Sequence, residues 1–329
     1  MRINHIKYRL FTVLPSAKSA LLALLTLASC SMRDDNYLKD KKEEIVDVIP
    51  PDDDVSAITQ LIIDNTNVIG TFQMDSTTMI ADGIAHTHIR YLNQQELPMS
   101  IHVLEVDLSN GNLVAYAMSP YNDRLYGFQR ISEMARDNEK TGTKIMAAIN
   151  ADYYNTSTGE PTGTFIINGL QRKINTSATR PYFAIMQDGT AVIGRAPVAG
   201  QGEEINLNAV EHLVSGNEWL VFEGESVNYS NYSIEPRTAI GLTQDQRVYV
   251  VIVDGRQQYF SNGCGMEELR QMMLAFGTYH AFNLDGGASS TLAIRIEPSR
   301  VGTGWAVKNR PSDGVERAVA NGLAFAVVE

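Results

Sequence analysis

The segment 281–291 holds the residues of this chain best suited to chemistry. An apolar run ends at Leu284, and a carboxylate, Asp285, and two glycines, Gly286 and Gly287, follow at once. The apolar spacing predicts a strand that ends at Leu284, and the glycines let the backbone turn sharply and approach a ligand closely. Backbone N–H groups in such a turn can face an anion. The segment therefore predicts a strand-end site for a charged sugar or phosphate, with a solvated turn between strands as the alternative.

Polar residues stand at the ends of other apolar runs as well. They include Asn150 and Asp152 after one run, Arg237 before another, and Asp254 and Arg256 after the next. The last two runs flank a polar turn, so they predict a hairpin that brings Arg237 near Asp254 and Arg256. An arginine offers a planar fork that suits phosphate oxygens. A surface ion pair between Arg237 and Asp254 is the alternative, and such a pair adds little stability.

These polar groups must be positioned by strands, because most of the chain from Val55 onward has the pattern of β-structure. Expected strands are 84–92, 101–107, 113–118, 165–168, 182–186, 191–194, 238–242, 248–253 and 318–328. Asn-Gly and Asp-Gly pairs predict hairpin turns at 110–111, 168–169 and 188–189.

Helical spacing appears in only two places, 128–139 and 266–276, and Gly277 would end the second helix. Many strands with few helices predict an α+β fold of mixed, mainly antiparallel β-sheets. We expect a polar cavity where the strand ends meet.

The order of these motifs resembles one known family. The motifs are Asn150-Ala151-Asp152-Tyr153-Tyr154, Pro161-Thr162-Gly163, Arg237-Thr238-Ala239-Ile240-Gly241, Val253-Asp254-Gly255-Arg256, Glu268-Leu269, Asn283-Leu284-Asp285-Gly286-Gly287 and Arg317-Ala318-Val319-Ala320-Asn321. Together they resemble the phosphodiester glycosidase domain of the N-acetylglucosamine-1-phosphodiester alpha-N-acetylglucosaminidases, the mannose 6-phosphate uncovering enzymes, and their bacterial relatives. Ala288 stands where that family usually has a third glycine.

The resemblance implies a hydrolase that acts on a sugar, N-acetylglucosamine in the family, joined through its anomeric carbon to a phosphodiester. It also implies one cavity that gathers residues from several strand ends. Carried across to this sequence, the cavity would contain Asn150, Arg237, Asp254, Gly255, Arg256, Glu268, Asp285, Gly286 and Asn321.

A sugar phosphodiester has a good leaving group, so the site must mainly hold the anion, stabilise the anomeric centre and direct a water. We expect Asp285 at the anomeric carbon as base or nucleophile, and Glu268 as the second carboxylate. Arg237 and Arg256 would bind the phosphate, and Asp254 would orient an arginine or bind sugar hydroxyls. Sugar contacts are expected from Asn150 and Asn283, and backbone donors from Gly286 and Gly287. Glu268 borders the apolar face of its helix, so it is either buried with an arginine or solvated at the rim.

No cofactor is required by this chemistry, and any metal is unassigned. Asp152, Asp254 and Asp285 are three carboxylates that could together bind a hard cation such as calcium or magnesium. His86 and His88 alternate on one strand face, but no third ligand motif accompanies them.

The first 29 residues have the pattern of a secretory signal, with four basic residues, no acidic residue and a short apolar block. The junction resembles a bacterial lipobox, which predicts lipidation of Cys30 and an envelope protein anchored to a membrane. A charged tether over 30–55 would lead to one domain over 56–329, divided into a β-rich part, 56–140, and the motif-bearing part, 141–329. Without the signal the net charge falls from −11 to −15, which disfavours nucleic acid as a partner.

Two other functions fit the same residues. One is a non-catalytic, surface glycan-binding lipoprotein that holds saccharides with Tyr153 and Tyr154. The other is a hydrolase of a different phosphodiester in an exopolysaccharide or cell wall.

Overall fold

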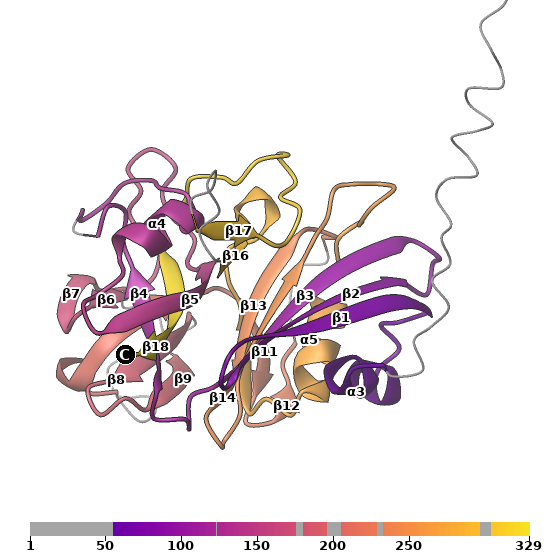
Figure 1. Ribbon diagram of the computed structural model, residues 1–329, viewed down its shortest axis with the longest axis horizontal. Coiled ribbons are helices and arrows are strands. Elements are labelled where there is room, and N and C mark those ends of the chain that lie inside the picture. The colour runs from indigo at the N-terminus through magenta and orange to yellow at the C-terminus, as the bar shows by residue number, and fades with distance from the viewer. Residues whose placement is uncertain (1–54, 123, 176–179, 196–204, 229–232, 297–303) are drawn as a thin grey trace, which may run out of the picture. The chain divides into compact units, whose positions relative to one another are not determined.

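Three β-sheets carry the chain in the computed structural model, which describes residues 55–329 apart from 123, 176–179, 196–204, 229–232 and 297–303 (Figure 1). All the described residues belong to one unit, Pro51–Glu329. The expected signal over 1–29, the lipidation site at Cys30 and the tether, except for Val55, lie outside the described residues.

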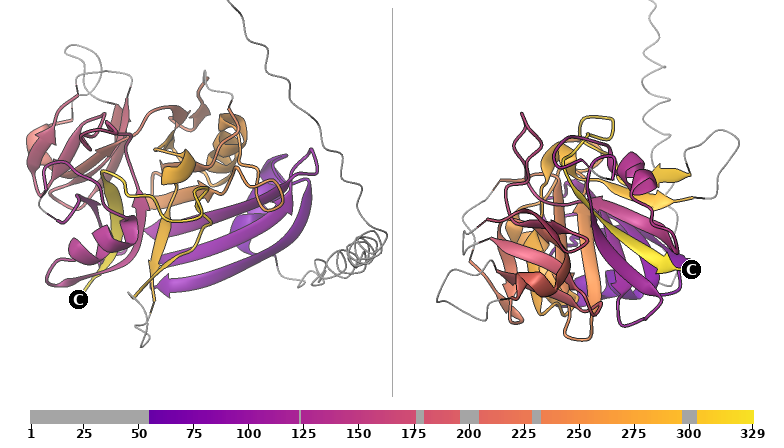
Figure 2. Two further views of the ribbon diagram at one scale, coloured as in Figure 1. Left: turned by 90° about the horizontal axis from the view of Figure 1, so that it is seen from above. Right: turned by 90° about the vertical axis from the view of Figure 1, so that its left-hand side faces the viewer.

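The largest sheet has eight strands. Their spatial order is β1 (Thr71–Ala81), β2 (Ile84–Leu92), β3 (Pro98–Asp107), β14 (Arg247–Val253), β13 (Arg237–Leu242), β15 (His280–Asn283), β11 (Trp219–Phe222) and β12 (Glu225–Ser226). The first three strands lie beside strands from the C-terminal third of the chain (Figure 2). The N-terminal β part therefore supplies three of the eight strands of the sheet that carries the site motifs.

Two five-stranded sheets complete the fold. One has the order β7 (Leu170–Lys173), β6 (Phe165–Ile167), β10 (Val210–Ser215), β8 (Pro181–Met186) and β9 (Ala191–Arg195). The other has the order β17 (Trp305–Val307), β16 (Leu292–Arg295), β5 (Thr143–Asn150), β18 (Gly322–Val328) and β4 (Leu113–Met118). All pairings between the described strands are antiparallel. The α+β class with mainly antiparallel sheets is thereby confirmed.

The central strand β14 is apolar on both faces, and this explains the layers. Val248, Val250 and Ile252 join the core cluster shared with the two smaller sheets. Val251 and Val253 face the opposite way, toward α3 (Ala57–Asn65) and α5 (Met266–Ala275). The sequence of a strand that is covered on both faces is a continuous apolar run, because neither face contacts water.

The helices agree with the sequence in part. Helix α5 begins at Met266 as expected, and the chain turns at Gly277 with φ +70°. The helix expected over 128–139 is shorter, α4 (Ile131–Asp137). Helix α3 was not expected, since a segment of nine residues with three isoleucines and one threonine is too short and too β-branched for a clear helical pattern.

Local turn signals specify some hairpins and not others. The turns at 168–169 and 188–189 do join paired strands, β6 with β7 and β8 with β9. The expectation of a hairpin at 110–111 is wrong, because β3 and β4 belong to different sheets. There the turn carries the chain from the large sheet to a small one, and β3 instead pairs with β14, far away in sequence.

Candidate active site

A cavity of about 350 Å³ lies where five segments of the chain converge. It is lined by Tyr153, Tyr154, Thr156, Ser233, Glu235, Arg237, Arg256, Asp285, Gly286, Gly287, Ala288, Ser289 and Arg317. A wider hollow of about 570 Å³ lies elsewhere, around Asp245, Arg247 and Tyr279. None of the residues singled out for chemistry lines that hollow, so we take the smaller cavity as the candidate site.

The loop after β15 is tied to two other strands. Asp285 N donates to Ala151 O at 2.9 Å, and Asn150 Nδ2 donates to Asp285 O at 2.6 Å, which joins the loop to the end of β5. Gly287 N donates to Pro236 O at 2.8 Å, at the start of β13. A Cβ at Gly286 would lie 2.8 Å from the same Pro236 oxygen, so only glycine fits there.

Three arginines of the cavity are each fixed through Nε. Arg237 Nε donates to Cys264 O at 3.3 Å, Arg256 Nε to Glu235 Oε2 at 2.7 Å, and Arg317 Nε to Asp313 Oδ2 at 3.1 Å. The Arg256 guanidinium lies over Gly287, where a Cβ would come within 3.3 Å of Nη2. Arg237 Nη2 also donates to Ser233 O at 2.5 Å, and Arg317 Nη2 to Asp313 Oδ2 at 2.7 Å. The nitrogens that could be directed at an anion are therefore the terminal pair of Arg256 and Nη1 of the other two arginines.

Asp285 is the carboxylate within this group of arginines. Burial raises its pKa to about 6, and hydrogen bonds from the Ser289 hydroxyl and the Gly286 N–H, with the charge of Arg317, limit the rise. The Ser289 hydroxyl is also a hydrogen-bond partner of Tyr154. A carboxyl group with a pKa near 6 can exchange protons close to neutral pH, as acid–base catalysis requires.

The three asparagines expected to contact substrate hold the backbone of the site. Asn150 Oδ1 accepts from Thr238 Oγ1 and Thr291 N, both at 3.0 Å. Asn321 Oδ1 accepts from Asp152 N at 2.6 Å. Asn283 Nδ2 donates to Tyr153 Oη at 2.9 Å. All three are buried, and none is among the residues that line the cavity.

Of the three glycines expected at the site, only two line the cavity. Gly286 and Gly287 line the cavity. Gly255 does not, because it packs against the backbone of the neighbouring loop, where a Cβ would come within 2.8 Å of Gly263 Cα.

Glu268 lies outside the cavity lining, contrary to its expected role. It is the third residue of α5, and its Oε2 accepts from Gly265 N at 2.8 Å. This bond satisfies an N–H group that the first turn of a helix would otherwise leave unpaired. The side chain is half-buried, and its hydrogen bond goes to the start of its own helix and not to an arginine.

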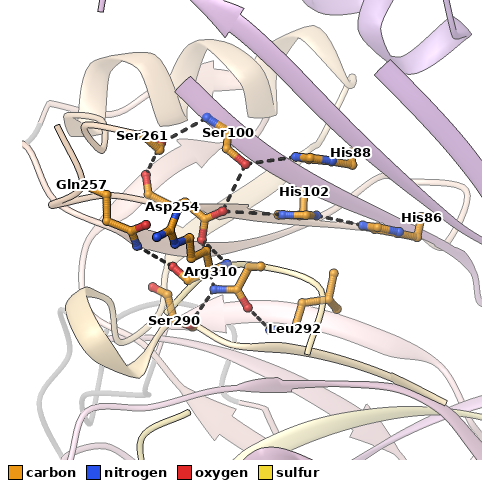
Figure 3. Close-up of polar contacts among 11 residues, drawn as sticks. His86, His88, Ser100, His102, Asp254, Gln257, Ser261, Ser290, Leu292 and Arg310 are labelled. Carbon is orange, nitrogen blue, oxygen red and sulfur yellow. Dashed lines mark hydrogen bonds and ion pairs between the residues drawn. The ribbon is translucent and has the colours of Figure 1, made fainter. Parts of the chain in front are cut away.

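Asp254 also points away from the cavity, into a buried polar network (Figure 3). Its Oδ1 accepts from Arg310 N at 2.7 Å, and its Oδ2 accepts from Ser100 Oγ at 3.1 Å and lies 3.6 Å from His102 Nε2. The expected hairpin is present, with Arg237 paired to Val253, yet the Asp254 side chain turns to β3.

The histidines of β2 belong to the same network. His86 Nε2 lies 3.0 Å from His102 Nδ1, and His88 Nε2 lies 3.0 Å from Ser100 Oγ (Figure 3). The ring of His102 stacks between those of His86 and His88, at 5.2 and 4.3 Å. Burial lowers the pKa of His86 to about 3 and that of His88 to about 4, so both are neutral at ordinary pH.

The three aspartates considered for a cation have separate partners. Asp152 is buried with Arg180 at 2.5 Å and accepts from Gly163 N at 2.6 Å, while Asp254 and Asp285 lie in the surroundings given above. Within the described ranges, no group of three or more His, Cys, Asp or Glu side chains is arranged to hold a metal ion.

The cavity also contains residues to which the sequence assigned no catalytic part. Arg317 opens the last motif of the ordered set, and Glu235 stands two residues before Arg237. Ser289 follows the two glycines. Their closeness to the motifs was the only available signal, because nothing in the sequence indicates which neighbours of a motif turn toward a cavity.

A half-buried carboxylate that shares a cavity with three arginines suits an anionic ester, and the strand ends of a β-rich fold form this site. The chain belongs to the phosphodiester glycosidase family, which matches residues 143–326.

Curated relatives share part of the chain. Over 166 residues it is 25% identical to N-acetylglucosamine-1-phosphodiester alpha-N-acetylglucosaminidase of Bos taurus, covering 45% of this chain and 31% of the relative. The human enzyme of that name is 26% identical over 168 residues, with 45% and 31% covered. The match thus spans about a third of the length of these relatives.

Solved structures share the fold. The catalytic domain of the zebrafish enzyme of that name superposes with a TM-score of 0.56 at 20% identity, covering 78% of this chain and 83% of that one. An exported protein of Burkholderia pseudomallei gives a TM-score of 0.52 at 14% identity, with 77% and 96% covered. At these identities the likeness concerns the fold alone.

Proposed function

We propose that this protein hydrolyses a sugar-1-phosphodiester and releases the sugar, N-acetylglucosamine being the sugar suggested by the names of its relatives. The observation that carries the proposal is Asp285, whose pKa is raised to about 6 in a cavity that three arginines also line. The arginines would bind the phosphate, and Asp285 would stand at the anomeric carbon.

The roles follow from the chemistry of the bond. The departing phosphate is weakly basic, so a strong general acid is not required, and charge stabilisation provides most of the catalysis. Above pH 6 Asp285 is mainly ionised and can act as base toward water or as nucleophile. Glu235 is the second carboxylate of the cavity, and through its bond to Arg256 it would orient that arginine on the phosphate.

The assay is release of reducing sugar from a synthetic N-acetylglucosamine-1-phosphodiester. We expect the wild-type protein to release sugar and Asp285→Asn to lose at least 100-fold in kcat, since the variant keeps the size of the side chain but lacks the basic carboxylate. Asp188→Asn, in an exposed turn between β8 and β9, is the matched control and should retain full activity.

Binding of the phosphodiester without sugar release would instead indicate a glycan-binding protein. If the protein releases sugar from a polymeric exopolysaccharide or wall phosphodiester but not from the small substrate, the proposed bond type stands and the proposed substrate is replaced by the polymer. Hydrolysis in ¹⁸O-labelled water identifies the bond that breaks, because the label enters the sugar after C1–O cleavage and the phosphate after O–P cleavage.

A further inference from the structure

Behind the cavity lies a group of polar side chains that the proposed roles do not use. Tyr153 lines the cavity, and Asn283 Nδ2 donates to its hydroxyl oxygen at 2.9 Å. Asn283 N donates to Glu218 O at 2.8 Å, so these two residues are neighbours on adjacent chain segments, next to the paired residues Trp219 and Phe282. Tyr153, Asn283 and Glu218 thus lead from the cavity back to the edge of β11.

The hydrogen bond from Asn283 determines what Tyr153 can offer a ligand. Its hydroxyl oxygen is already occupied as an acceptor, so its own hydrogen is the group left to donate. Burial and the nearby charge of Asp285 raise the pKa of Tyr153 to about 12, which keeps that hydrogen in place at neutral pH. Tyr153 is therefore a neutral donor beside the carboxylate of the site.

This polar group is not fully satisfied within the fold. Asn283 Oδ1 and Glu218 Oε2 are buried without a hydrogen-bond partner among the described residues, and burial raises the pKa of Glu218. A buried acceptor left unpaired costs about 1–3 kcal/mol, whereas apolar side chains of similar shape would pack there without that cost. Polar groups kept at such a cost beside a cavity are typical of a binding site.

We propose that the Tyr153 hydroxyl is a specificity determinant that donates a hydrogen bond to the oxygen-bearing substituent on C2 of the bound sugar. Asn283 acts as a positioning residue behind it, and the nearby negative charge of Glu218 helps to keep the hydroxyl hydrogen in place. The inference rests on the proposed function, because it assumes that Asp285 stands at C1, the carbon next to C2. The proposed function assigns the arginines of the cavity to the phosphate, which leaves the Tyr153 hydroxyl for the sugar.

The test compares three substrates that differ only at C2: the methyl phosphodiesters of N-acetylglucosamine, glucose and 2-deoxyglucose, each linked at C1. For the wild type we expect kcat/KM to be highest with an oxygen-bearing substituent. Tyr153→Phe removes one hydroxyl and should lower kcat/KM on the order of tenfold for the first two substrates, but less than about twofold for the 2-deoxy substrate. The ratio between substrates is the readout, since a general loss of folding would lower all three equally.

Tyr154→Phe is the matched variant in the same cavity. Its hydroxyl bonds to Ser289 and not to Asn283, so it should leave the substrate ratios unchanged, whatever it does to the overall rate. Glu218→Gln should lower the ratios in the same direction as Tyr153→Phe, by about threefold. The exposed Glu225→Gln, at the edge of the same sheet, should change nothing.

Each other outcome is decisive. An equal loss on all three substrates after Tyr153→Phe would mean that the hydroxyl serves the phosphate or Asp285, and the inference would be overturned. Unchanged kinetics would overturn it as well. A wild-type protein that cleaves neither these three substrates nor a polymeric sugar-1-phosphodiester would overturn the proposed function, and the inference with it.

Discussion

Asp152 is fully buried and Asp285 half-buried, and both have a pKa raised to about 6, but their surroundings give them different tasks. Asp152 is paired with Arg180 at 2.5 Å and accepts from Gly163 N, so its charge is compensated inside the fold. Asp285 has only the Ser289 hydroxyl, the Gly286 N–H and the charge of Arg317 to oppose the cost of burial. A carboxylate kept at such a cost in a cavity is what a reacting group requires.

This difference predicts opposite effects on stability. Because the folded-state pKa of Asp285 lies above its ordinary value of 3.8, folded protein holds a proton that the unfolded chain has released, and stability falls as pH rises from about 4 to 6. Asp285→Asn should remove this penalty and raise the free energy of unfolding at pH 7 on the order of 2 kcal/mol, with little change at pH 4.

Urea unfolding at both pH values measures the effect. Asp152→Asn is the comparison, and it should destabilise the protein by about 3 kcal/mol because it leaves Arg180 without its buried partner. A loss of stability at pH 7 of similar size in both variants would show that Asp285 is as well compensated as Asp152.

At the scale of elements, the side chain of Glu268 has a structural role, because it caps the start of α5. Glu268 accepts the N–H of Gly265, the residue before the helix, and its helix packs Leu269, Met272 and Met273 on the large sheet. The adjacent Cys264 carbonyl accepts from Arg237. The beginning of α5 therefore supports the arginine from behind, through the backbone.

A pair of substitutions separates this capping task from the catalytic role expected from the sequence. Glutamine can still accept the Gly265 N–H, so Glu268→Gln should keep both stability and kcat/KM, within about twofold. Glu268→Ala removes the cap and should lower Tm by about 2–4 °C, for a loss near 1 kcal/mol. Thermal unfolding and the sugar-release assay give the two readouts, and a loss of 100-fold in kcat with Glu268→Gln would restore the catalytic role.

At the scale of the molecule, the cavity exists because two of the three sheets bring distant segments together. Tyr153 follows β5 of one small sheet, Arg237 begins β13 and Asp285 follows β15 of the large sheet, and Arg317 precedes β18. No helix in the described residues is long and apolar enough to cross a bilayer. We propose that the attachment to a bacterial envelope is made by a lipid on Cys30, through the charged segment that precedes residue 56.

Replacement of that cysteine tests the attachment. Cys30→Ser should move the protein expressed in a bacterium from the membrane fraction to the soluble fraction and abolish incorporation of labelled palmitate, because the thiol is the group that carries the lipid. Sugar release by the soluble protein should stay at the wild-type level. Retention in the membrane fraction after this change would show that the anchor lies elsewhere.

Much of the fold and part of the site could be predicted from the sequence. Turn chemistry determined the hairpins at 168–169 and 188–189, and the apolar spacing with Gly277 determined α5. The motifs also pointed to residues that do line the cavity, namely Arg237, Arg256, Asp285, Gly286 and Gly287. These features depend on neighbours in the chain, and neighbours are what a sequence displays.

Only the tertiary structure decided which polar strand-end side chains face the cavity. Asp254 and Arg256 are two residues apart, yet one joins the histidines of β2 and β3 and the other lies over Gly287. The direction of each side chain depends on which distant strand packs against it, and β3 could not be assigned beside β14 from local pattern. The sequence thus provided the groups needed for the chemistry, and long-range packing determined which of them meet.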